Sequence, residues 1–591
     1  KKLQNIKKTK IDIKKWVSAT SVGSFMMNDG LIDLIKEKRR HRSNNLKGGN
    51  TNPLFQKKKK FEDGIKFENN VMNILFNHFE IETICEQKDD CFDVKKYEET
   101  KKAIEDGKEI IYQGLLYNYK TKTFGMPDLI VRSDIVNKLV YEDILCDDEL
   151  TKYSKSANKY KHYYIIIDIK ASQLNLCCNG QYILNSGYLK ANKAQLYIYM
   201  KALNKIIDNG TTRTFILGKR IKYQSCKTVY THNNCFYTLG EIDFSARDQP
   251  LIPYIRNAIR WKKHIKKNHT EYNLFKPISY EFYPNMSNKY DDAAYREKKK
   301  IADKVFEITN IWNCGFKERK FAFKKGITSW KDRRCNTKNL GITGEWKEPR
   351  VQAILDINQS RRRLLKCHNF LNTKGWKNED NLEFFVDFET VITEQQNINV
   401  NEYSITTDYS TVLAMIGCGW IENGEWCFKN FTVDDFSLKS ERKIINQFMK
   451  FIKNMKLKHR CTRNPRIYHW GHAEKSILNK MNIKHRRNWH INSWVDLCKI
   501  MMDEIIVVNG ALNFGLKSVA RAMYNHDMIS TCWNNEMNGL QAMETMIDCE
   551  EIARKQNKRF QDLKHVKDVM KYNEVDCKVM WEIISYFREK I

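Results

Sequence analysis

Hydrophobic residues recur at both helical and strand spacing over the first part of the chain. In residues 64–79 the apolar positions have helical spacing, which predicts an amphipathic helix. Residues 163–170, YYIIIDIK, form a short run rich in β-branched side chains, which is typical of a buried strand. Residues 214–225 and 236–244 predict two further strands around a polar turn region. We therefore expect an α/β domain over residues 1–250.

A second α/β pattern occupies residues 381–591. Strand-like runs at 382–391, 411–420 and 425–433 predict a meander, and residues 440–455 then have the spacing of an amphipathic helix. Strands that precede helices in this way are typical of a mixed sheet with helices packed on it.

The stretch between these two patterns, residues 251–380, is helical, aromatic and basic in character. It holds 30 basic and 14 acidic residues, a net +16 out of +31 for the whole chain of 591 residues. An excess of this size favours a polyanionic partner, so we expect a helical basic connector that forms a nucleic-acid path. A lysine-rich solvated surface encoded by an AT-rich genome is the alternative explanation of the charge.

Residues 326–344 of this connector predict a short helix between glycine-bounded turns. Arg333 and Arg334 are expected to be exposed there. The pair is a candidate contact for a phosphate backbone, and a hinge at which two domains dock is the alternative.

A first group of candidate catalytic residues lies in the first domain. Asp128 follows Pro127, and a proline fixes its own φ and favours the beginning of a strand. Asp168 and Lys170 are two residues apart on the predicted strand 163–170, so their side chains leave the same face. An acid that can bind a metal ion then stands beside an ammonium group that can neutralise developing negative charge.

Three further residues complete this group. Glu68 lies at the edge of the buried face of the predicted helix 64–79, where its carboxylate could complete a metal shell. Gln195 and Tyr199 are four residues apart in a helical pattern, so both can reach one ligand. Ordinary packing is the alternative interpretation of these last two residues.

The ordered set of G-x₂-FE, PD, D-x-K and Q-x₃-Y resembles the RecB-type PD-(D/E)XK nuclease domain, the group that includes λ exonuclease-like enzymes. The resemblance implies a restriction-endonuclease-like fold. It also implies that Glu68, Asp128 and Asp168 bind Mg²⁺, that Lys170 assists the attacking water, and that the helix with Gln195 and Tyr199 supports the site.

A second group of acids lies in the last domain. Asp387 and Glu389 are two residues apart on a predicted strand with apolar neighbours, so both face one side. Two buried acids on one face raise each other's pKa values unless a cation lies between them. Tyr572 and Asp576 are four residues apart on a predicted helix and share a face. Glu474 opens another predicted helix directly after a strand.

This second group resembles the tyrosine-bearing variant of the DEDD exonucleases, which have the RNase H-like fold. The resemblance implies metal binding by Asp387, Glu389 and Asp576 and orientation of a water molecule by Tyr572. Glu474 departs from the family, which usually has Asp at that position, and this puts the activity of the second site in doubt. We expect nearby Asp496, His469 and His472 to have structural roles.

The arrangement of both domains around the connector resembles predicted two-nuclease proteins of bacteria and large DNA viruses. It implies a nuclease that depends on Mg²⁺ or Mn²⁺ and hydrolyses DNA, single- or double-stranded, from its ends, in DNA repair, recombination or genome processing. The alternatives are a nuclease directed at RNA or hybrids, and a DNA-binding or packaging protein with degenerate sites.

The cysteine pattern and the hydropathy indicate in which cellular compartment the protein is expected. Its 17 cysteines are scattered without a CxxC pair, and only Cys226 and Cys235 follow the core of the predicted first domain within residues 1–250. We therefore expect reduced thiols and no iron–sulfur cluster. No apolar run is long enough for a membrane span and no signal peptide opens the chain, so we expect an intracellular protein of the cytosol, nucleus or viral factory.

Overall fold

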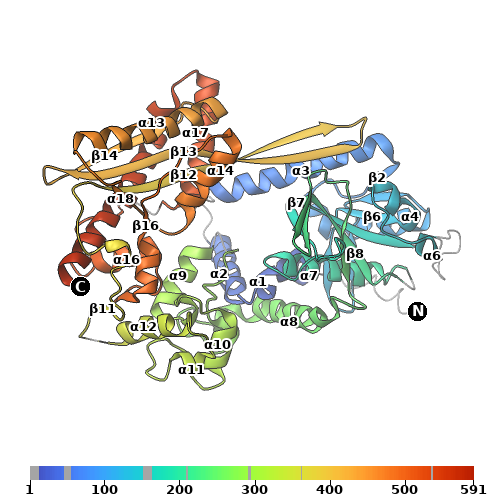
Figure 1. Ribbon diagram of the computed structural model, residues 1–591. Coiled ribbons are helices and arrows are strands. Elements are labelled where there is room, and N and C mark those ends of the chain that lie inside the picture. Colours follow the sequence, from blue (N-terminus) through green and yellow to red (C-terminus); the bar gives the residue numbers. More distant parts are fainter. Residues whose placement is uncertain are drawn as a thin grey trace. The chain divides into compact units, whose positions relative to one another are not determined.

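The protein is a mixed α/β structure with several mixed sheets, as the sequence predicts. The computed structural model describes residues 12–45, 55–150, 163–207, 210–290, 294–360, 362–533 and 537–591. The chain forms two compact units (Figure 1). Unit 1 comprises Lys1–Val305 and Gln395–Asp408, and unit 2 comprises Phe306–Glu394 and Tyr409–Ile591.

The helices of unit 1 are α1 Gly23–Met26, α2 Leu31–Asn45, α3 Phe55–His78, α4 Val94–Glu105, α5 Ser133–Val136, α6 Asp147–Leu150, α7 Leu189–Leu203, α8 Ile252–Asn268 and α9 Tyr295–Lys304. Its strands are β1 Val17–Ser18, β2 Ile81–Thr83, β3 Ile110–Tyr112, β4 Leu116–Asn118, β5 Thr123–Gly125, β6 Leu129–Arg132, β7 Tyr164–Asn175, β8 Arg213–Ser225, β9 Thr228–His232 and β10 Gly240–Asp243. The predicted helix at 64–79 and the strands at 163–170 and 214–225 are confirmed by α3, β7 and β8.

The main sheet of unit 1 has the strand order β10-β8-β7-β6-β3-β2, and β9 pairs with β8. Strand β6 is antiparallel to both of its neighbours, β3 and β7, whereas β8 is parallel to β7. A parallel pair needs a crossover connection, and the chain between β7 and β8 contains α7. Strands β1, β5 and β4 form a separate three-stranded sheet.

Helices cover both faces of this sheet, and β7 is buried between them (Figure 1). Because side chains alternate along a strand, Ile165 and Ile167 pack in the cluster that contains α3, whereas Tyr164 and Ile166 pack in the cluster that contains α7. Asp168 continues the second series. Its carboxylate therefore lies on the α7 side of the sheet, in an interior that helices shield from water.

The helices of unit 2 are α10 Phe316–Phe323, α11 Thr337–Leu340, α12 Glu348–Gln359, α13 Leu438–Lys458, α14 Ala473–His485, α15 Leu497–Asp503, α16 Leu516–Tyr524, α17 Gly539–Gln556 and α18 Lys564–Lys590. The strands are β11 Leu365–Cys367, β12 Glu383–Asn399, β13 Ser404–Glu422, β14 Glu425–Thr432, β15 Arg466–His469, β16 Trp494–Asp496 and β17 Ile506–Val508. The predicted meander and the helix that follows it are confirmed by β12, β13, β14 and α13. The residues around the turn between β12 and β13, Gln395–Asp408, belong to unit 1.

The five-stranded sheet of unit 2 has the order β14-β13-β12-β15-β16. Strands β13 and β14 are antiparallel, and β12, β15 and β16 are parallel to one another. The link of four residues between β12 and β13 is too short for a parallel crossover, so this pair is antiparallel. The first three strands thus form a meander, and β12 lies at the centre of the sheet.

Alternation along β12 separates its apolar and acidic side chains. Phe388 contacts Phe448 of α13 on one face of the sheet. On the opposite face Asn573 of α18 donates a hydrogen bond to the Asp387 carboxylate. Glu389 is two residues further along, so it lies on the same side as Asp387.

The basic stretch at 251–380 is divided between the two units. Helices α8 and α9 belong to unit 1, and α10, α11 and α12 belong to unit 2. Some of its cations are structural: Lys298 pairs with Asp29 in unit 1, Arg319 pairs with Glu307 in unit 2, and all four side chains are buried. These cations already have a carboxylate partner, so they are not available to a nucleic acid.

None of the helices in the described part of the chain combines the length and apolarity needed to cross a membrane.

Gly125 at the end of β5 should not tolerate a side chain. A Cβ placed there would lie 2.1 Å from the ring of Tyr199 on α7, so Gly125→Ala must displace either the strand or the tyrosine. We expect a loss of stability of about 1–3 kcal/mol, as for other overpacked cores. The change is to be measured by denaturant unfolding of the purified variants.

Gly64→Ala is the matched control within unit 1. A Cβ at Gly64 meets no atom within 4 Å, and the residue lies inside α3. Alanine is favoured over glycine in helices by about 1 kcal/mol, so this variant should be as stable as the parent or more so. Equal losses in the two variants would contradict the proposed packing of Tyr199 against β5.

Candidate functional site

Three carboxylates of unit 2 converge on one point. Asp387 and Glu389 come from β12 and Asp576 comes from α18, and one oxygen of each lies within 4.8 Å of the others. The spacing of two residues on a strand and the packing of α18 against the same face bring them together, as the sequence predicts. Glu389 and Asp576 are buried, and each is less than 10% exposed to solvent.

Burial raises the pKa values of all three acids, and repulsion from neighbouring acids of the group adds to the effect at Asp387 and Glu389. Desolvation, with the nearby Asp576 and Glu389 charges, raises the pKa of Asp387 well above its ordinary range. Desolvation and the Asp576 charge raise the pKa of Glu389 to about 8. Desolvation raises the pKa of Asp576 to about 6, against the opposing effect of the Lys517 cation. Full ionisation of the three acids at neutral pH is therefore unfavourable unless a cation lies between them.

Neighbouring side chains fix the orientation of two of these carboxylates. The amide of Asn573 donates to Asp387 at 2.7 Å, and the indole of Trp533 donates to Asp576 at 2.9 Å. A Cβ at Gly417 would lie 1.9 Å from the amide oxygen of Asn573. Glycine at 417 thus allows β13 to come close enough to α18 for Asn573 to reach the strand that carries Asp387.

A phenol and an ammonium group stand beside the three acids. Tyr572 lies one helical turn before Asp576 on α18, and the Nζ of Lys517 on α16 lies 4.4 Å from the centre of its ring. Desolvation and the Asp576 charge raise the pKa of Tyr572, so the phenol keeps its proton at neutral pH. Desolvation lowers the pKa of Lys517, and the charges of Asp576 and Glu389 oppose that effect.

Glu474 is buried near this group but is not one of the three converging acids. It is the second residue of α14, which begins after β15, as predicted. Its carboxylate lies 3.1 Å from Nδ1 of His469, so the histidine has a structural partner. Asp496 caps the start of α15 by accepting from the Lys499 amide, which confirms the expected structural role.

The sheet of unit 1 brings Asp128, Asp168 and Lys170 together. Asp128 directly precedes β6, and its carboxylate accepts from the backbone amide of Ile169 on β7 at 2.6 Å. The ammonium group of Lys170 forms an ion pair with Asp168. Both oxygens of Asp168 are buried and, within the described residues, accept no further hydrogen bond.

The electrostatics of this site differ from those in unit 2 because a cation lies inside it. Desolvation and the Asp168 charge raise the pKa of Asp128 well above its ordinary value, while Lys170 opposes the shift. Burial alone would lower the pKa of Lys170, but the Asp168 and Asp128 charges raise it. Lys170 is therefore charged at neutral pH.

The remaining predicted residues of unit 1 surround this centre. Glu68 on α3 accepts hydrogen bonds of 2.9 Å from the phenol of Tyr112 and the amide of Gln113. Gln113 also reaches Asp128 at 3.3 Å, so it bridges the two carboxylates.

Gln195 and Tyr199 lie on one face of α7, and the amide of Gln195 donates to the phenol of Tyr199 at 2.9 Å. Desolvation, together with the nearby Asp168 and Asp128 charges, raises the pKa of Tyr199. The tyrosine therefore lies next to the acids, as the sequence predicts, and it also packs in the core.

Both groups have the donor set of a divalent metal site, and their geometries differ. Carboxylate oxygens are the ligands that Mg²⁺ prefers. Within the described part of the chain, only Asp387, Glu389 and Asp576 bring three such atoms within 4.8 Å of one another. The buried carboxylate of Asp168, paired with Lys170, is also of the type that binds such a cation, but Glu68, Asp128 and Asp168 do not form so close a group.

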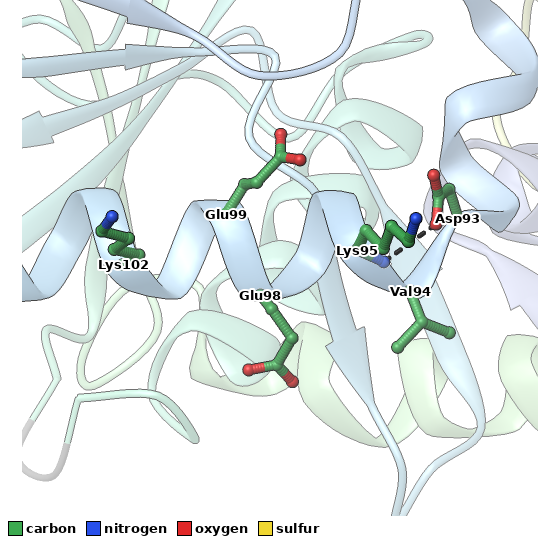
Figure 2. Close-up of a pocket in the computed structure, with 6 residues that line it drawn as sticks. All are labelled: Asp93, Val94, Lys95, Glu98, Glu99 and Lys102. Atoms are coloured by element: carbon green, nitrogen blue, oxygen red, sulfur yellow. Dashed lines mark hydrogen bonds between the residues drawn. The ribbon is translucent and has the colours of Figure 1, made fainter.

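A surface pocket of about 390 Å³ along α4 offers no comparable chemistry. It is lined by Asp93, Val94, Lys95, Glu98, Glu99 and Lys102. Figure 2 shows the carboxylates of Glu98 and Glu99 pointing to opposite sides of the helix, while Asp93 caps it through the Lys95 amide. Glu98 and Glu99 already pair with Lys101 and Lys96, so this is a charged helix surface.

Arg333 and Arg334 lie in the turn before α11 and are exposed, as predicted. Arg334 is held by Asp332, with its guanidinium 2.7 Å from the carboxylate. Arg333 takes part in no ion pair within the described residues. The positive charge of Arg333 is therefore better available to a phosphate than that of Arg334, which Asp332 partly neutralises.

Lys517, Trp533, Asn573 and Gln113 are neighbours of the two sites that sequence reasoning did not identify. Asn573 directly follows Tyr572, so it had a local signal, whereas Gln113 follows β3, a strand that the sequence analysis did not predict. Lys517 and Trp533 come from segments with no motif, and only the folded chain brings them to Asp576.

No protein-family model, curated protein or solved structure matches this chain.

The raised pKa of Glu389 predicts a pH-dependent loss of stability in metal-free protein. The folded form holds the proton up to pH about 8, whereas the unfolded carboxyl ionises at its ordinary pKa of 4.5. The unfolded state therefore binds fewer protons in this window, and the contribution of Glu389 to stability falls as the pH rises from 4.5 to 8. Glu389→Gln removes this penalty, so its melting temperature should exceed that of the parent by roughly 2 °C or more at pH 8.

Thermal unfolding at a series of pH values, with a chelator present, measures this difference. The gap between Glu389→Gln and the parent should widen with pH, and added Mg²⁺ should close it by stabilising only the parent. Glu425→Gln, an exposed acid on β14, is the control and should follow the parent at every pH. Parallel curves for Glu389→Gln and the parent would contradict the buried, repelled state of this carboxyl.

Proposed function

We propose that this protein is a nuclease that hydrolyses DNA phosphodiester bonds with Mg²⁺ or Mn²⁺, using one active centre in each unit. The observation that carries the proposal is the convergence of Asp387, Glu389 and Asp576 within 4.8 Å on one buried face. A protein gains nothing structural from three repelling acids in that position, whereas a bound divalent cation would relieve the repulsion.

The topology of each unit supports the assignment. In unit 2, a three-stranded meander is followed by two parallel strands in the order β14-β13-β12-β15-β16, which is the arrangement expected of an RNase H-like sheet, and the acids lie on its central strand. In unit 1, helix α3, the antiparallel strands β3, β6 and β7, helix α7 and the parallel strand β8 follow one another as expected of a PD-(D/E)XK core.

In unit 2, Asp387, Glu389 and Asp576 would hold the metal, which when bound polarises a phosphate oxygen and lowers the pKa of a bound water. Tyr572 keeps its proton, so it can orient a water molecule through its hydroxyl but cannot act as a base. Lys517 places its ammonium group beside the acids, where it can attract a phosphate. The three acids set the position of the scissile bond.

In unit 1, Asp168, Asp128 and Glu68 would hold the metal, and Lys170 provides a fixed positive charge. Because Lys170 stays protonated, it is suited to stabilise the negative charge that develops on the phosphate. Gln113 fixes the distance between Glu68 and Asp128 through its two hydrogen bonds. Tyr199 closes the α7 side of the centre.

Cleavage assays on end-labelled single-stranded DNA, double-stranded DNA and RNA test the proposal directly. Purified protein should cleave DNA with Mg²⁺ or Mn²⁺ and should be inactive in a chelator. Cleavage of RNA alone would redirect the proposal to an RNA nuclease. Tight binding of DNA without cleavage under any metal would favour a DNA-binding protein with degenerate sites.

The two centres should be chemically independent because they lie in different units. Asp168→Ala removes a metal ligand from unit 1, and Asp387→Ala removes one from unit 2. Loss of such electrostatic and metal contributions costs factors of about 10²–10³ or more, so the loss is unmistakable. We expect each single variant to retain one cleavage activity, with a changed substrate or end preference, and the double variant to be inert.

Asp303→Ala in unit 1 and Glu425→Ala in unit 2 are exposed acids far from both motifs in sequence and serve as controls. Circular dichroism should show that all variants are folded. If Asp168→Ala alone abolished every cleavage, unit 2 would be a binding or structural unit, an outcome for which the departure at Glu474 gives a reason.

Salt dependence of DNA binding tests the role of the exposed arginines. Each phosphate contact releases condensed counterions and adds about 0.7–0.9 to the slope of log affinity against log salt. Arg333→Gln should weaken binding for every sequence and reduce the slope by up to that amount. Arg334→Gln should have less effect because Asp332 already neutralises Arg334. An unchanged slope for both variants would mean that this turn does not contact DNA.

A further inference from the structure

The hairpin β8–β9 of unit 1 carries a row of parallel aromatic rings. Tyr230 stacks on its cross-strand partner Tyr223, with ring centres 4.9 Å apart and planes 13° apart. The rings of Tyr223 and His232 are 6.0 Å and 15° apart, and those of His232 and Tyr237 are 3.5 Å and 11° apart. Four rings thus share nearly one orientation along the hairpin.

The row has a free end and a closed end. Tyr230 is 41% exposed and, within the described residues, stacks on Tyr223 alone. At the other end the phenol of Tyr237 is hydrogen-bonded to Glu142. A planar ligand that continues the stack would therefore add at Tyr230.

The charge of the hairpin has a single sign. Residues 218–232 contain four lysines and arginines and no aspartate or glutamate. Two of these cations are committed to the fold: Lys219 is buried beside the Phe67 ring, and Arg220 donates to Gln173. Lys222 and Lys227 are exposed and enter no ion pair within the described residues. The exposed surface of the hairpin is therefore aromatic and positive.

The hairpin continues the strand next to β7, which carries Asp168 and Lys170. β8 is parallel to β7, with Asp168 opposite Ile216 and Lys170 opposite Gly218. Tyr223 packs against the same apolar cluster as Ile216, the neighbour of Asp168. The five residue steps from Gly218 to Tyr223 span about 17 Å at the usual rise of a strand, which is the length of a few nucleotides of an extended single strand.

We propose that the β8–β9 hairpin is a stacking platform for a single strand of DNA, with a base on Tyr230 and phosphates beside Lys222 and Lys227. Bases stack on aromatic side chains irrespective of sequence, and lysines that follow the backbone supply the remaining affinity. A stack that served only the stability of the hairpin would not need a terminal ring in water or a hairpin sequence without acidic residues. The inference rests on the proposed function. It specifies that unit 1 binds its DNA as a single strand next to the site of Asp168.

The test uses the full chain in a chelator, so that binding is measured without cleavage. The probe is a fluorescently labelled oligothymidylate, and affinity is measured by anisotropy. Tyr230→Leu keeps an apolar side chain but removes the ring, so binding should weaken about ten-fold. Tyr230→Phe keeps the ring and should bind as the parent does. Tyr524→Leu, at a tyrosine of similar exposure (44%) on α16 of unit 2, should also leave binding unchanged.

Photocrosslinking locates the contact independently of affinity. An oligothymidylate that contains 5-iododeoxyuridine should crosslink to Tyr230, and mass spectrometry should find the adduct in the peptide that spans β9. The double variant Lys222→Gln, Lys227→Gln should flatten the salt dependence without moving the crosslink.

The platform is refuted if Tyr230→Leu binds like the parent, if Tyr230→Phe is as weak as Tyr230→Leu, or if the crosslinks avoid β9. These outcomes leave the proposed nuclease intact as long as the parent cleaves DNA with metal. A parent that crosslinks at Tyr230 but never cleaves would refute the nuclease and support the platform, so the two failures are distinguishable.

Discussion

Repulsion between buried carboxylates is the interaction on which both candidate sites depend. Two unit charges 4.8 Å apart repel by about 3–4 kcal/mol at an effective dielectric constant of 20, and three acids of unit 2 lie within that distance of one another. This repulsion is a substantial fraction of the whole stability of a domain, which is about 5–15 kcal/mol. The acids must therefore hold protons, pair with a cation of the chain or bind one from solution.

The two units meet this constraint in different ways. In unit 1 the strand that carries Asp168 also carries Lys170, two residues away on the same face, and the pair forms an ion pair. In unit 2 no cation lies on β12 beside the acids. Lys517 comes instead from α16, and burial disfavours its charge. The unit 1 centre therefore has an internal counter-ion, whereas the unit 2 centre depends on protonation or on a bound metal to balance its charge.

Local periodicity accounts for the parts of these sites that the sequence predicted. A spacing of two residues on a strand placed Asp387 with Glu389 and Asp168 with Lys170 on one face, and a spacing of four on a helix did the same for Tyr572 and Asp576. The residues that modify the pKa of Asp576 lie in other segments of the chain. Trp533 and Lys517 reach Asp576 only because separate segments pack together. The basic stretch at 251–380 shows the same limit, because composition cannot tell that its helices are divided between two units.

The count of 102 lysines and arginines overstates how many cations the protein can offer to a polyanion. Lys298 and Arg319 are buried in ion pairs, Lys193 is buried against Asp248, and Arg334 is exposed but held by Asp332. Such cations balance acids of the same fold and would release few counterions on binding a polyanion. Affinity for a phosphate backbone would have to come from exposed cations without a carboxylate partner, such as Arg333, Lys222 and Lys227. The positions of such side chains, rather than the total charge, would decide which surface of the protein a polyanion contacts.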